Sequence, residues 1–439
     1  MNLLYKIKPK PTKNHVLIIK NISPELNNKT MKLYFGQNFI SVKIQLSDDI
    51  EANEILLSDN ILEYLKVPLY CYYQLNVQSD RLILGPFIGI LANLTEIGLE
   101  RRLLDLYSYV KHYTKIGGII TAFSLDQINI GQSYIEKGYV YHPQKKKWLP
   151  STNIPLPASI FNKCKVIVND TWEFLSNCYK SSMFNFPTFD KWDMHKWFSQ
   201  DSLLKQTLPS TKICSHPNEI LDFLKKYKRA YFKPIGGTFA QGIIILSYHQ
   251  QGVSIQYEKK RNIVTHTFYK KIEFKKFFKK ILRRGDYLIQ EAISLLTSEN
   301  RVIDFRFIYI KNIEGTWEDN GLFARYGKLG SGISNLTRGG TPKEGIAALK
   351  EFLLEEEVNQ KLEEMKLIAE KASLMLEKKL IQCGNLGFDF GIDINNKLWI
   401  IEINNEDPDH RIATVCKRKD ILYNARLQNM LFAKKLAGF

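Results

Sequence analysis

The chain has few of the features that mark secreted, membrane-spanning or disulfide-stabilised proteins. Its six cysteines are Cys71, Cys164, Cys178, Cys214, Cys383 and Cys416. They are widely scattered and form no Cys-x-x-Cys pair, which indicates free thiols in a reducing compartment. No apolar run approaches the roughly 20 residues that a membrane-spanning helix needs. We therefore expect a protein without disulfides and without a membrane span.

Targeting and low-complexity signals are also missing. Residues 1–10 lack the apolar core and the small-residue cleavage site of a secretory signal, so we expect a cytoplasmic protein. The sequence contains no internal repeat and no low-complexity linker. With 439 residues, 44% hydrophobic and 24% charged, it is long enough for two or three domains of ordinary globular composition.

Acidic residues are fewer than basic ones, 45 against 62, so the net charge is +17. Such a charge suits nucleic-acid binding, but the basic residues do not form one tract. The densest cluster, residues 270–284, carries the apolar spacing of a surface helix at Phe274, Phe277, Phe278, Ile281 and Leu282. Its lysines form either a solvated face or a docking site for an acidic macromolecule. Nucleic acid is not the partner that we expect.

The most informative segment is residues 386–404. Two runs rich in β-branched and aromatic residues flank Asn395-Asn396, which predicts a hairpin. Folding it at that turn brings Asp389 beside Glu402 and Asn404. Carboxylate and amide oxygens are the ligands that Mg²⁺ prefers. Taken alone, the hairpin is equally compatible with a polar, solvent-facing strand surface.

A second motif lies in residues 230–246, where Lys233 ends one apolar run and a glycine-rich turn precedes the next. Gly236, Gly237 and Gly242 allow backbone amides to approach an anion, and Lys233 adds a positive charge. The loop joins strand to strand, so neither a P-loop nor a Rossmann fingerprint fits. The alternative is a turn without a ligand.

Three further segments separate these motifs. Residues 286–293 form an apolar run that ends in Gln290-Glu291, a hinge whose backbone can bind an adenine edge. Residues 304–310 begin by alternating polar and apolar positions, which places Asp304 and Arg306 on one strand face. Residues 322–340 are rich in glycine, hydroxyl groups and arginine.

In this order the motifs resemble the ATP-grasp superfamily, and within it the YheC/YheD-like group that is associated with bacterial spore coats. Upstream landmarks of that group lie at residues 84–90, 155–157, 189–192 and 208–212. Two features depart from the pattern. Ala240 and Gln241 replace a glycine and a basic residue of the loop, and Asn405-Glu-Asp-Pro408 follows the metal motif where small residues are common.

The resemblance implies a mixed α/β and α+β architecture, an ATP-grasp fold preceded by a parallel-sheet pre-ATP-grasp domain and a small β-rich domain. The local patterns agree: short β-type runs with polar turns fill residues 1–85, and strand-then-helix units fill residues 86–190. Residues 191–439 form the expected catalytic region. Within it, residues 218–228 and 344–382 are expected to be helical, and residues 165–168 to form a strand in the preceding domain.

The resemblance also assigns roles to individual residues. It implies ATP as cofactor with Mg²⁺, or Mn²⁺ in its place. The assigned residues are Lys212 and Lys233 at the phosphates, Gly237, Thr238 and Gly242 over them, Gln290, Glu291 and Ile293 at adenine, Asp304 at the cofactor, Arg325 and Arg338 at the transferring phosphoryl group, and Asp389, Glu402 and Asn404 at the metal.

The activity implied by the resemblance is ATP-dependent ligation of a carboxylate to an amine through an acylphosphate, on an amino acid, a peptide or a protein. The partners would be a carboxylate substrate and an amine acceptor, which the net charge predicts to be acidic. One alternative is a non-catalytic nucleotide-binding protein of the spore coat. Another is a nucleic-acid binder, whose binding would depend steeply on salt and ignore the loss of Asp389.

Overall fold

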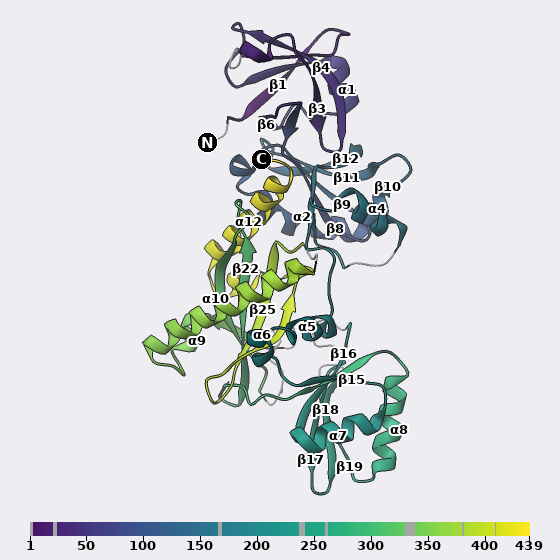
Figure 1. Ribbon diagram of the computed structural model, residues 1–439, viewed down its shortest axis with the longest axis vertical. Helices are drawn as coiled ribbons and strands as arrows, with labels where there is room; N and C mark the ends of the chain where they lie inside the picture. The colour runs from purple at the N-terminus through teal and green to yellow at the C-terminus, as the bar shows by residue number, and fades with distance from the viewer. Residues whose placement is uncertain are drawn as a thin grey trace.

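The computed structural model describes residues 3–20, 24–165, 169–236, 242–259, 262–329, 339–379, 382–408 and 410–439. Four β-sheets are arranged along the long axis of the molecule, and the fourth in chain order lies between the second and the third (Figure 1). All six cysteines are free thiols. Within the described residues, no helix is long and apolar enough to cross a membrane.

The first sheet is a closed barrel with the strand order β1-β5-β2-β4-β3-β7-β6. Its elements are β1 (Tyr5–Lys10), β2 (Val16–Lys20), β3 (Thr30–Phe35), β4 (Asn38–Ser47), β5 (Glu54–Ser58), α1 (Asp59–Leu65), β6 (Tyr72–Val77) and β7 (Arg81–Gly85). The expected β-rich character is confirmed. Closure, which the sequence did not predict, leaves no exposed strand edge.

The second sheet has the order β10-β11-β9-β8-β13-β14, with β12 paired to β11. Its elements are β8 (Phe87–Asn93), α2 (Glu96–Val110), α3 (Tyr113–Ile116), β9 (Ile119–Ser124), β10 (Ile128–Asn129), β11 (Tyr134–His142), β12 (Lys147–Pro155), β13 (Ser159–Asn162), α4 (Asp170–Cys178) and β14 (Met183–Phe184). Strands β9, β8, β13 and β14 are parallel, as expected. The sequence predicts a strand over residues 165–168, of which residues 166–168 lie outside the described residues. The described strand that precedes them is β13.

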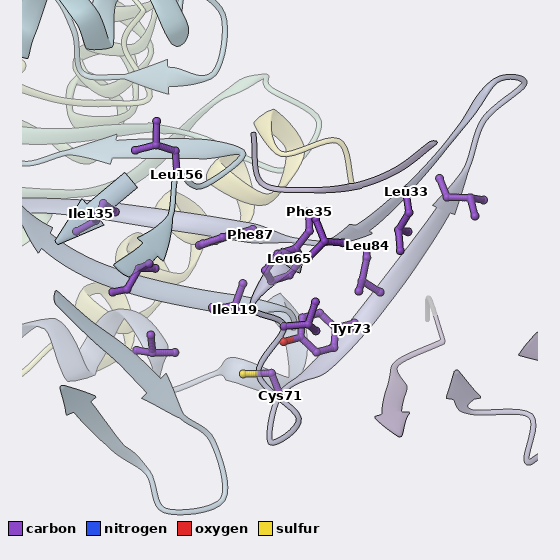
Figure 2. Close-up of a cluster of buried hydrophobic side chains, with 14 of the residues drawn as sticks. Leu33, Phe35, Leu65, Cys71, Tyr73, Leu84, Phe87, Ile119, Ile135 and Leu156 are labelled. Atoms are coloured by element: carbon purple, nitrogen blue, oxygen red, sulfur yellow. The ribbon is translucent and has the colours of Figure 1, made fainter. Parts of the chain in front are cut away.

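The barrel and the second sheet share one hydrophobic core (Figure 2). Phe35 and Tyr73 enter it from the barrel, and Phe87 and Ile119 enter it from the second sheet. The rings of Phe35 and Phe87 are 5.0 Å apart. Burial of this apolar surface is the main force that holds the two sheets together.

The third sheet, called the small sheet below, has the strand order β15-β20-β16-β17-β18-β19. Helices α5 (Lys191–Phe198) and α6 (Ser202–Gln206) lead into it. Its elements are β15 (Thr211–Cys214), α7 (Pro217–Tyr227), β16 (Arg229–Pro234), β17 (Ile244–His249), β18 (Gly252–Lys259), β19 (Asn262–Phe268), α8 (Lys271–Leu282) and β20 (Tyr287–Glu291). Helix α7 confirms the helix expected over residues 218–228. The apolar stripe of α8 packs into a core that also includes Phe232 and Ile289.

The fourth sheet has the order β24-β23-β22-β25-β26, with β21 paired to β22. Its strands and the helices that follow β24 are β21 (Thr297–Ser298), β22 (Arg301–Lys311), β23 (Trp317–Tyr326), β24 (Thr341–Glu344), α9 (Gly345–Leu349), α10 (Glu355–Lys378), β25 (Asn385–Ile392) and β26 (Leu398–Asn404). The single helix predicted over residues 344–382 is wrong, because it is divided into α9 and α10. The backbone amide of Leu354 donates to Glu357 at 2.8 Å, a capping interaction that begins a new helix.

The C-terminal helix α12 (Lys419–Leu436), preceded by α11 (Ile412–Val415), connects the fourth sheet to the second (Figure 1). It contacts β22 and β23 as well as α2, β8 and β13. An ion pair of 2.9 Å joins Arg426 of α12 to Asp105 of α2. The end of the chain reaches the barrel, where Asn76 donates to the carbonyl of Gly438 at 2.7 Å.

Candidate active site

One face of the fourth sheet gathers polar side chains because of strand register. Asp304 and Arg306 are two residues apart on β22, so they share a face. Asp304 lies opposite Arg325, and Arg306 lies opposite Asp389. On β26, Glu402 lies opposite Asp389, and Asn404 lies opposite Gly387. Residues directly opposite in antiparallel strands share a face, so all six polar side chains lie together.

Four of these side chains form a buried ion network. Arg325 donates to both oxygens of Asp304, at 2.6 and 2.7 Å, and to Asp389 Oδ2 at 2.9 Å. Arg306 donates to both oxygens of Asp389, at 2.5 and 3.1 Å. Burial alone would raise the pKa of Asp389, but the two guanidinium groups lower it below its ordinary value. Both arginines are therefore held by carboxylates on the site face.

Glu402 and Asn404 lie beside this network. Glu402 is more open, with 37% of its side chain exposed, and its carboxylate lies 3.1 Å from Lys191 Nζ at the start of α5. The amide nitrogen of Asn404 lies 3.3 Å from Asp389 Oδ2, so the amide oxygen is turned away from that carboxylate. These contacts place Lys191 in the site.

The donor set fits Mg²⁺ only as part of a larger complex. Among the described residues no group of three His, Cys, Asp or Glu side chains could hold a metal. Glu402 and Asn404 do present hard oxygens on one face, and Mg²⁺ usually combines one or two protein carboxylates with water and substrate phosphates. Asp389, the third expected ligand, already accepts hydrogen bonds from both arginines through its two oxygens.

Lys233 approaches from the small sheet. It is buried at the end of β16, and its Nζ donates to Gln290 Oε1 at 2.6 Å. Gln290 in turn donates to Thr211 Oγ1 at 3.0 Å. Burial lowers the pKa of Lys233 to about 8; the charge of Glu402 opposes this shift, and that of Lys191 adds to it. The charge of Lys233 therefore interacts with Glu402 of the fourth sheet and with Lys191 of α5.

The expected adenine hinge continues from β20. The backbone amide of Glu291 donates to the backbone carbonyl of Ser210 at 2.9 Å. The carbonyl of half-buried Ile293 accepts from the backbone amide of Leu295 at 3.0 Å. Gly242 has a φ of 74°, a left-handed conformation that favours glycine. Three of the expected residues, Gly237, Thr238 and Arg338, lie outside the described residues.

Lys212 is not brought to this group. In the β15–β20–β16 register it aligns with Ile289 and Phe232, whereas Lys233 aligns with Leu288. Lys212 therefore lies on the opposite face of the small sheet, which α7 covers. Its Nζ lies 3.3 Å from Glu219 of α7, and 57% of its side chain is exposed.

Sequence reasoning missed the positions of Lys191 and Arg306 in the site. A signal for Lys191 is present in the sequence, because residues 189–192 are one of the landmarks that carry the resemblance. The Asp190 carboxylate accepts hydrogen bonds from the backbone amides of Trp192 and Asp193, each at 2.8 Å, and so begins α5 at Lys191. The period-2 pattern places Arg306 on the same face as Asp304 but assigns it no role.

Comparison with known proteins identifies the family. The model of the YheC/D-like ATP-grasp family matches residues 180–436, more than half of the chain. The chain belongs to this family. The matched region includes the small sheet, the fourth sheet and the residues described above, and it confirms the ATP-grasp fold expected from the sequence.

Two curated relatives come from Bacillus subtilis (strain 168). The endospore coat-associated protein YheD is 25% identical over 413 residues, 90% of each chain. The endospore coat-associated protein YheC is 25% identical over 304 residues, 66% of this chain and 82% of the relative. Among solved structures, the D-alanine-D-alanine ligase from Coxiella burnetii is 12% identical with a TM-score of 0.43, covering 79% of this chain and 93% of that one.

Proposed function

We propose that this protein is an ATP-dependent ligase that joins a carboxylate to an amine through an acylphosphate. The observation that carries the proposal is the grouping of Glu402 and Asn404 with Lys191 and Lys233 beside a buried arginine network, in a chain of the ATP-grasp family. Phosphoryl transfer requires mainly positioning and neutralisation of charge, which these residue types supply.

The residues divide the work by their positions. Lys191 and Lys233 bind the phosphates of ATP, and the backbone of residues 290–293 holds adenine. Glu402 and Asn404 would hold Mg²⁺, which would neutralise the negative charge of the phosphates. Asp389 and Asp304 orient Arg306 and Arg325 toward the site face. Gly237, Thr238 and Gly242 remain candidates for the loop over the phosphates, and Arg338 for the transferring group.

The alternative is a nucleotide-binding protein of the spore coat that does not catalyse ligation. Its support is the description of the two relatives as endospore coat-associated. The two proposals differ in one measurement. The protein is incubated with Mg-ATP and pairs of candidate acids and amines, and phosphate release is followed together with mass spectrometry of the products. Phosphate release coupled to a new covalent product supports the ligase; ATP binding without a product for any pair supports the alternative.

Replacement of Lys233 by Met is expected to weaken ATP affinity by about 10- to 100-fold, the loss of one charge-assisted contact. The pKa of about 8 adds a pH test. Wild-type affinity should fall as pH rises through about 8, because only protonated Lys233 attracts phosphate, and the Met variant should lack this step. Calorimetry at pH 7, 8 and 9 checks both points. Unchanged affinity in the variant would remove Lys233 from the phosphate site.

An acidic acceptor is expected to react more slowly as salt rises. The net charge of +17 and the exposed lysines of α8 attract it, and salt screens this attraction over roughly 8–10 Å. The fall should lie in kcat/KM, with less change in ATP hydrolysis without acceptor. Reversing Lys275 and Lys279 to Glu should reproduce it at low salt. If turnover ignores both salt and these reversals, α8 is only a solvated face.

A further inference from the structure

The second sheet contains a point where its connections diverge. β8 and β13 are parallel neighbours, with Asn162 opposite Leu91. After β8 the chain passes through α2 to β9 on one side, and after β13 it passes through α4 to β14 on the other. In open α/β sheets, ligands bind in the crevice outside the carboxyl ends of such a strand pair.

Two basic side chains lie at this point. Lys163 directly follows β13, and its backbone amide donates to Leu91 at 2.9 Å. Arg102 of α2 donates to the carbonyls of Ala92 at 2.7 Å and Lys163 at 3.3 Å, so it crosses the ends of both strands. Lys163 Nζ also donates to the Tyr109 hydroxyl at 2.9 Å. Both cations are held in place by the second sheet and its helix.

One carboxylate meets both cations. Asp407, in the loop after β26, contacts Arg102 Nη2 through Oδ2 and Lys163 Nζ through Oδ1. Lys163 has only 2% of its side chain exposed, whereas Arg102 and Asp407 have 27% and 28%. Arg102 and Lys163 together can therefore hold a planar group with two oxygens. The partly exposed Arg102 makes this position accessible from solvent. Since two cations face one carboxylate, the position favours an anionic ligand over a cationic one.

Asp407, which contacts Arg102 and Lys163, lies next to the proposed ligase site along the chain. Asp407 is three residues beyond Asn404 on the same chain segment. The next residue, Pro408, flanks Gly387 together with Arg306: a Cβ at position 387 would lie 3.1 Å from Pro408 Cβ and 3.3 Å from Arg306 Cδ. A substrate bound at Arg102 would therefore lie on the side of the sheet that carries the ion network.

We propose that Arg102 and Lys163 bind a carboxylate of the substrate other than the one that reacts. Until the substrate binds, the side chain of Asp407 occupies the position of that carboxylate. This inference rests on the proposed ligase function and adds the class of substrate, one that carries an anchoring carboxylate. The competing explanation is a permanent brace, in which Asp407 only fixes the loop after β26 to the second sheet.

The test uses the full chain with Mg²⁺ and a non-hydrolysable ATP analogue, and calorimetry measures binding. The probes are unbranched dicarboxylates from malonate to pimelate, each paired with its monoamide, which keeps one carboxylate. At least one dicarboxylate should bind about 10-fold or more tightly than its monoamide. The preference should be lost in Arg102→Gln and kept in Arg101→Gln, a matched change at an exposed position of the same helix.

A second variant tests the place-holding role of Asp407. Asp407→Asn keeps the shape but removes the competing charge, so dicarboxylate affinity should rise. Equal binding of diacid and monoamide by the wild type, a preference that survives Arg102→Gln, or an unchanged or lower affinity in Asp407→Asn would overturn the inference. Failure of the wild type to bind the ATP analogue would overturn the proposed function itself. Binding of the analogue without a preference for the diacid would overturn only the carboxylate-binding role of Arg102 and Lys163.

Discussion

Replacing Glu402 with Gln is expected to lower turnover by at least about 100-fold, while the protein keeps its fold. The substitution keeps the size of the side chain but removes one negative charge from the proposed metal position. Of the three proposed metal ligands, Glu402 and Asn404 are the two that the arginine network does not occupy, so the loss of one should leave Mg²⁺ poorly held. Initial rates across a Mg²⁺ titration measure the effect, and part of the loss should be recovered at high Mg²⁺.

The fold should survive this change because Glu402 is partly exposed and its ion pair with Lys191 is only partly buried. A partly exposed pair of this kind contributes about 0–1 kcal/mol to stability. Glu356→Gln, an exposed position on α10, is the matched control. Near-normal turnover in Glu402→Gln, with a control that behaves like the wild type, would show that Glu402 holds no metal.

The hairpin of β25 and β26 could be predicted from sequence because its information is local. Period-2 alternation and the turn at Asn395-Asn396 set the pairing near the turn, where Ile392 lies opposite Leu398. A register shift between Asp389 and Phe390, which the alternation does not predict, then brings Asp389 opposite Glu402. Asp393 supports this turn, accepting from the backbone amides of Asn395 and Lys397 at 2.9 and 3.0 Å. The same period placed Asp304 and Arg306 on one face.

Contacts between distant segments could not be predicted in this way. The pair Lys191–Glu402 depends on how α5 meets β26, and Asp407 reaches Arg102 across 305 residues of chain. The face of Lys212 was also beyond reach, because β15 has only four residues and gives no periodicity to fix its phase. Closure of the barrel depends on pairing β1 with both β5 and β6, which no local pattern encodes.

Replacing Arg325 with Gln is expected to destabilise the protein by about 3–5 kcal/mol, the cost of breaking a buried ion pair from one side. Arg325 neutralises Asp304 and shares Asp389 with Arg306, and the side chains of all four residues are at most 11% exposed. Its loss leaves two buried carboxylates facing one guanidinium. Urea unfolding at neutral pH measures the change, and Arg301→Gln, at the more exposed start of β22 in the same sheet, should cost far less.

The double variant Asp304→Asn/Arg325→Gln separates charge from packing. It leaves Asp389 paired with Arg306 and removes the unpaired carboxylate, so it should be more stable than Arg325→Gln alone even though it carries one more substitution. Lower pH should also narrow the gap between wild type and the single variant, because a buried carboxylate without its cation has a raised pKa and becomes neutral more readily. A double variant that is less stable than the single one would contradict this prediction. It would show that Arg325 stabilises the sheet by packing and hydrogen bonding, and not by neutralising the charge of Asp304.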